Sequence, residues 1–164
     1  MRRFGVLATM AVFTATLIGC DPVFAVQYRQ ALQPAPARQC VADALAASRV
    51  VTVAAPVMTK ESGLARAPGF RVIERDSTAR NGVTRELIVT HALLDSATSA
   101  RVAVTYEFMG GGPSADERRR LAVLANEILA EVRSACAPGT VPAAVECRHL
   151  VSLMSRNGSA CPAV

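Results

Sequence analysis

The pattern that most constrains the fold of this chain is the alternation of side chains over residues 100–108. Every second residue there is apolar and those between are polar or small, which is the period of a β-strand with one buried and one wet face. The apolar members are Val102, Val104, Tyr106 and Phe108. Residues 69–76 and 83–93 also have the composition of β-strands, so we expect three neighbouring strands.

Short polar segments separate these three runs, which predicts an antiparallel meander. The pair Asn81-Gly82 suits the positive φ angles of a two-residue hairpin turn. If it forms that turn, Val72 lies opposite His91, and His91 faces the core. We therefore expect His91 to be a hydrogen-bonded histidine in the core or at its edge, and not a metal ligand or a catalytic base.

Helical patterns flank the predicted sheet. Residues 38–48 favour a short helix, and residues 49–58, rich in β-branched side chains, favour a first strand or an extended crossover. The longest predicted helix follows a glycine-rich turn. It starts with a capping box made by Ser114 and Glu117, and its apolar stripe continues to Cys136.

A third helix is expected over residues 142–156, before the stop signal Asn157-Gly158. Together these patterns predict the α+β class: an antiparallel sheet of three or four strands, arranged as a meander, with helices packed on one face. We expect residues 39–164 to form a single disulfide-stabilised domain.

Four cysteines lie in the predicted domain, an even number that favours two disulfides in an exported protein. They are Cys40, Cys136, Cys147 and Cys161. Their connectivity stays open, although a bridge from Cys147 to Cys161 requires the last helix to end early. Cys136, Cys147 and Cys161 also have, together with His149, the ligand types of a zinc or copper site. The chain has no C-x-x-C pair, so no metal site is expected.

The first 20 residues are organised differently from the rest of the chain. Arg2 and Arg3 precede an uncharged apolar run over residues 4–19, which is the layout of a secretory signal peptide. The run ends in Leu-Ile-Gly-Cys at residues 17–20. This ending resembles the lipobox of bacterial lipoproteins, and the resemblance covers residues 1–20 only. The alternatives are an ordinary secretory peptide and an uncleaved anchor.

The resemblance implies that residues 1–19 are a lipoprotein signal peptide and that Cys20 is the lipidation site. In that family the cysteine thiol receives a diacylglyceryl group and the new amino terminus is usually acylated, so that several acyl chains give a stable membrane anchor. Residues 20–38 contain prolines and are expected to form a tether. The protein would be exposed to the periplasm, on the inner membrane if Asp21 acts as a retention signal and otherwise on the outer membrane.

The sequence contains no recognisable catalytic motif. Gly110, Gly112 and Ala115 match the spacing of a dinucleotide-binding loop, but an antiparallel sheet and acidic residues at the helix start argue against that role. No cofactor is expected, and basic residues scattered among acids predict no nucleic-acid partner. We expect a non-catalytic binding or envelope-assembly module, anchored to the membrane by lipid, whose partner is an envelope protein, a peptide or a lipid.

A small periplasmic hydrolase with a histidine base is the alternative. It would use His91 with Asp95 and Ser96, or His149 with Ser152. No nucleophile turn of the type G-x-S-x-G surrounds either serine, so we expect the protein not to be an enzyme.

Overall fold

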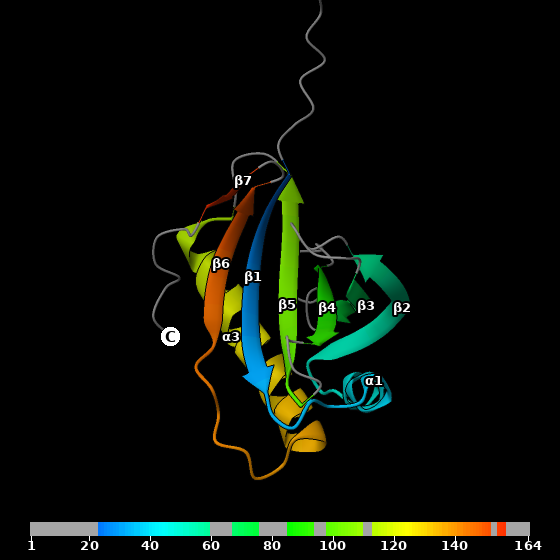
Figure 1. Cartoon of the computed structure of the whole chain (residues 1–164). Helices are drawn as coiled ribbons and strands as arrows, with labels where there is room; N and C mark the ends of the chain where they lie inside the picture. Colours follow the sequence, from blue (N-terminus) through cyan, green and yellow to red (C-terminus); the bar gives the residue numbers. More distant parts are fainter. Residues whose placement is uncertain are drawn as a thin grey trace, which may run out of the picture.

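The computed structural model describes residues 23–59, 67–75, 85–93, 98–109, 113–151 and 154–156. Within these residues the chain forms an antiparallel β-sheet, and the helices α1 and α3 pack against one of its faces (Figure 1). The predicted α+β class is therefore confirmed. The sheet is larger than the expected three or four strands, because the described residues form seven, in the order β2-β3-β4-β5-β1-β6-β7.

The helices are α1 (Arg38–Ala46) and α3 (Ala115–Cys136). The strands are β1 (Val23–Leu32), β2 (Val51–Thr59), β3 (Ala67–Glu74), β4 (Glu86–Leu93), β5 (Ala100–Met109), β6 (Glu146–Val151) and β7 (Met154–Arg156).

The tether predicted over residues 20–38 is wrong for most of that segment, because residues 23–32 form β1 and helix α1 starts at Arg38. All ten residues of β1 pair with β5, and six of them also pair with β6 on the other side. The strand alternates as expected for a sheet, with Val26, Tyr28 and Leu32 in the core. Of the prolines in this segment, Pro34 and Pro36 follow the strand and interrupt no pairing, and Pro22 lies outside the described residues.

The predicted meander is present as β3-β4-β5, and β2 extends it at the edge. The register between β3 and β4 differs from the prediction, because Val72 lies opposite Leu87 and not His91. The connection between these strands spans residues 75–85 and is longer than a two-residue turn. Asn81-Gly82 lies outside the described residues. The register error is an even number of residues, so His91 still faces the core, opposite Val102.

The long helix begins and ends where its sequence signals lie. Ser114 Oγ accepts a hydrogen bond from the Glu117 backbone N–H at 3.2 Å, which caps the first turn. The helix ends at Cys136, just before Gly139 with its φ of 78°. Its buried stripe, which includes Leu121 and Ile128, covers the core face of the sheet, as predicted.

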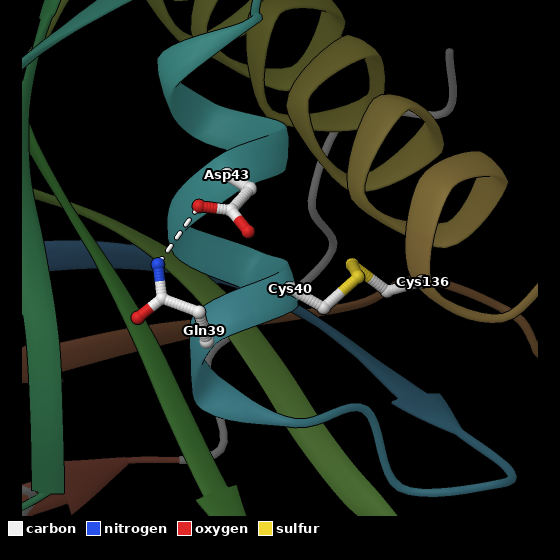
Figure 2. Close-up of a disulfide and its surroundings, with 4 residues drawn as sticks. All are labelled: Gln39, Cys40, Asp43 and Cys136. Carbon is white, nitrogen blue, oxygen red and sulfur yellow. Dashed lines mark hydrogen bonds between the residues drawn. A yellow bond between two sulfur atoms is a disulfide. The ribbon is translucent and has the colours of Figure 1, made fainter.

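Helix α1 confirms the short helix expected in this region and buries Val41 and Leu45 in the same core. A disulfide between Cys40 and Cys136 joins it to the end of α3, with a Cα–Cα distance of 5.8 Å (Figure 2). The two helices are therefore fixed to each other at one end of the molecule.

The third helix predicted over residues 142–156 is wrong, because this segment contains the strands β6 and β7. Cys147 and His149 lie opposite Tyr28 and Val26 of β1. The apolar residues of this segment fit the period of a strand as well as that of a helix. In a run this short, their spacing does not distinguish a helix from a strand. The segment forms a strand because the edge of β1 that does not pair with β5 offers hydrogen-bond partners for its backbone N–H and C=O groups.

Candidate functional site

Cys20, the predicted lipidation residue, lies outside the described residues. The nearest described residue is Val23, three positions further along the chain, where β1 begins. Neither α1 nor α3 combines the length and hydropathy needed to cross a membrane.

The three cysteines that the structure describes are all in disulfides. Cys40 is bonded to Cys136, and Cys147 is also disulfide-bonded, to a partner outside the described residues. Cys161 lies outside the described residues. A disulfide sulfur is not a thiolate ligand, so Cys136 and Cys147 do not join His149 in the metal site considered above. In the part of the chain that the structure describes, no group of three His, Cys, Asp or Glu side chains is placed to share a metal ion.

His91 lies in the core-facing row of β4 and is only 7% exposed. Burial lowers the pKa of its imidazole, the nearby charge of Arg38 lowers it further, and the carbonyl oxygen of Pro36 opposes these effects by accepting a hydrogen bond from the ring. Among the described residues its Nε2 has no hydrogen-bond partner. His91 is therefore a buried ring that burial keeps neutral, covered by the segment that leads into α1.

Acidification below neutral pH is expected to destabilise the protein through His91. Because its pKa is lower in the folded than in the unfolded state, stability is constant above the unfolded pKa of about 6.5 and falls as the pH drops from there towards the folded pKa. Each unit of lowering costs about 1.4 kcal/mol once both states are protonated. Denaturant unfolding between pH 7.5 and 5 should show this loss, and His91→Gln should flatten it. Identical slopes in the two proteins would contradict the assignment.

The other groups of the hydrolase alternative do not form a described cluster. Asp95, Ser96 and Ser152 lie outside the described residues. His149 lies in β6, partly exposed, opposite Val26 of β1. The two pockets described below contain no histidine in their walls. No described arrangement therefore favours the hydrolase over a binding protein.

The sheet face opposite the helices carries a buried polar row. Gln27 Nε2 donates to Thr105 Oγ1 at 3.2 Å between β1 and β5. Arg29 Nε donates to Glu146 Oε2 at 2.7 Å between β1 and β6, and a terminal nitrogen of Arg29 also contacts this oxygen. The Arg29 side chain is 9% exposed, whereas that of Glu146 is 62% exposed. The hydrogen bonds from Arg29 lower the pKa of the Glu146 carboxyl, and the positive charges of Arg101 and Arg148 assist.

Replacement of Glu146 with glutamine is expected to reduce the free energy of unfolding by about 1–2 kcal/mol, because it leaves the buried Arg29 guanidinium without a charged partner. In the wild type this contribution is present above about pH 4.5 and is lost as the pH falls through the lowered pKa of Glu146. Urea unfolding at pH 6 measures the difference. Glu107→Gln, at an exposed position of β5, is the control and should change stability by less than about 0.5 kcal/mol.

A charged pocket of about 420 Å³ lies between α3 and the segment that leads into β2. Its charged lining residues are Arg49, Glu74, Arg119, Arg120 and Glu127. Arg120 pairs with Glu74 at 3.8 Å, and Arg119 pairs with Asp116 just outside the pocket. The arginine run at residues 118–120 thus pairs in part with neighbouring acids, which leaves positive and negative groups interleaved in the wall.

A second hollow, of about 490 Å³, lies at the end of the sheet where β1 finishes. We call it the distal groove; its lining residues are Ala31, Leu32, Gln33, Ser99, Thr140, Val141 and Ala143. None of these side chains is charged. Val141 is 91% exposed, whereas Gln30, buried in β1, donates to the Ala143 carbonyl oxygen at 2.6 Å. Among the described residues the groove is therefore lined by uncharged groups, and its outer wall is hydrogen-bonded to the central strand β1.

The distal groove is not among the features predicted from the sequence. The run Thr-Val-Pro-Ala-Ala-Val at residues 140–145 overlaps the start of the helix predicted over residues 142–156, although it is uncharged and contains a proline. In the structure residues 141–144 are exposed and belong to no helix or strand. An uncharged exposed segment between two elements was the available signal.

Comparison of the chain with protein-family models, with curated proteins and with solved structures finds no match.

Proposed function

We propose that this protein is a lipid-anchored protein of the bacterial cell envelope that acts by binding a partner and not by catalysis. Its signal peptide comprises residues 1–19, Cys20 carries the lipid, and the domain is exposed to the periplasm. If Asp21 acts as a retention signal, the protein is anchored to the inner membrane. Otherwise it is anchored to the outer membrane.

The distribution of the cysteines carries this proposal. Cys40, Cys136 and Cys147 are in disulfides, which form and persist in oxidising compartments such as the periplasm. The chain has five cysteines, so a lipidated Cys20 leaves Cys161 as the partner for Cys147. Every cysteine then has a role that fits an exported lipoprotein.

The distal groove supports a binding role. The lining residues that the structure describes are uncharged, and the exposed segment of the groove contains Val141 next to Pro142. Such a surface suits an uncharged stretch of polypeptide, because exposed backbone groups can accept hydrogen bonds while small apolar side chains supply contact area. An envelope protein or a peptide is therefore a better partner for this groove than an ionic ligand.

Metabolic labelling with a fatty acid tests the anchor. The natural full-length chain should incorporate the label and sediment with membranes, while Cys20→Ser should incorporate none. Ser155→Ala, a similarly small change far along the chain, is the control and should behave as the natural chain. Equal labelling of the natural and Cys20→Ser proteins would refute the proposal.

Peptide mapping without reductant provides an independent test. A Cys147–Cys161 bridged peptide is expected beside the Cys40–Cys136 peptide. A bridge between Cys20 and Cys147 would exclude lipidation at that thiol.

A further inference from the structure

We infer that the lipid anchor holds the folded domain directly on the bilayer, with the start of β1 next to the lipid headgroups and the distal groove at the end that points into the periplasm. This inference rests on the proposed lipidation of Cys20. It goes further because it assigns a membrane-facing end and a partner-facing end to the domain.

Only two residues separate Cys20 from the first residue of β1. Val23 is the third residue after Cys20 and is already paired with Met109 of β5. A chain reaches at most about 3.3–3.6 Å per residue, so the start of β1 lies within about 10 Å of the lipidated residue. A tether that continued to residue 38 would have allowed the domain to lie tens of ångströms away.

The strand β1 does not unpair easily to lengthen this connection. It lies between β5 and β6, and its residues Val26 and Tyr28 are at most 4% exposed. Withdrawing the first half of the strand would break pairings on both sides and expose part of the core. The anchor and the domain are therefore joined without a spacer.

The distal groove lies at the opposite end of β1 from the anchor. In Figure 1 the start of β1 and the end of β5 lie at the top, whereas the end of β1, the end of α3 and the connection over residues 137–145 lie at the bottom. The strand β1 has ten residues, which at about 3.3 Å per residue separate its two ends by about 30 Å. The groove is lined by Ala31 and Leu32 at the far end of this strand.

Fluorescence energy transfer from single tryptophans tests the orientation, because the natural chain has no Trp. Glu107→Trp places the donor at an exposed position of β5, opposite Ala25 near the start of β1. Val141→Trp places it at the distal groove, at a residue that is 91% exposed. The lipidated full-length proteins are reconstituted into phosphatidylethanolamine–phosphatidylglycerol vesicles that contain a dansyl-headgroup lipid as acceptor.

We expect strong energy transfer from Glu107→Trp and at least severalfold weaker transfer from Val141→Trp. Insertion of a 15-residue Gly-Ser spacer between Asp21 and Pro22 should lower the transfer from Glu107→Trp towards that of Val141→Trp. Equal transfer from the two positions without the spacer, or an unchanged signal with it, would overturn the orientation.

Vesicle flotation separates failure of this inference from failure of the proposed function. Proteins that float with the vesicles but transfer equally from both positions are anchored and not upright, so only the orientation is refuted. Proteins that do not float refute the anchor, and the orientation with it. The outcome expected is flotation together with unequal transfer.

Discussion

An aspartate in place of Val26 is expected to lower the free energy of unfolding by about 4 kcal/mol or more, which is close to the whole stability of a small domain. Val26 is 1% exposed and lies in β1 between Tyr106 of β5 and His149 of β6. A carboxylate at this position must leave water and enter the packed interior of the sheet. This variant is expected to be unfolded or aggregated at 37 °C.

Ala31→Asp is the matched control, because it introduces the same side chain at an exposed position of the same strand, opposite Arg101. Its effect on stability should stay within about 0.5 kcal/mol. Circular dichroism during urea unfolding measures both variants. If neither aspartate lowered the free energy of unfolding by more than about 0.5 kcal/mol, β1 would not be a central strand of the sheet.

Removal of the Cys40–Cys136 disulfide is expected to cost about 3–5 kcal/mol. The bridge closes a loop with a sequence separation of 96 residues, and by the chain-entropy estimate a loop of about this length restricts the unfolded state by about 4–5 kcal/mol. The bridge also holds the end of α3 against α1, which is only nine residues long (Figure 2). The double variant Cys40→Ala/Cys136→Ala should therefore unfold at a much lower denaturant concentration.

Gln39→Ala is the control for this region. Gln39 Nε2 donates to Asp43 Oδ1 at 2.8 Å on the exposed side of α1, beside the bridge (Figure 2). Loss of this exposed pair should cost at most about 0.5 kcal/mol. If the double cysteine variant were no less stable than Gln39→Ala, the disulfide would add no stability to the fold.

Several elements could be predicted from local sequence because their signals lie within a few residues. The strand β5 follows from its alternation, and α3 follows from the cap at Ser114 and the stop signal near Gly139. The prediction that His91 of β4 faces the core is also confirmed, since an even shift of register does not move a side chain to the other face. The exact pairing of β3 with β4 could not be predicted, because the length of their connection did not follow from the Asn-Gly pair.

The buried polar row on the sheet face opposite the helices could not be predicted, for a different reason. Arg29 and Glu146 are separated by 117 residues, and Gln27 and Thr105 by 78. Each residue by itself is an ordinary polar side chain in a sequence with many arginines. Only the pairing of β1 with both β5 and β6 brings these partners together.

The amino-acid sequence by itself determined the α+β class, the antiparallel meander and the ends of the long helix, because these depend on side-chain periods and caps that act over one or two turns. The tertiary structure alone decided that residues 23–32 and 146–151 are strands, and that Cys40 bonds to Cys136. The physical reason is that a strand needs hydrogen-bond partners from elsewhere in the chain. Short segments with ambiguous periods therefore take the structure that their distant neighbours stabilise.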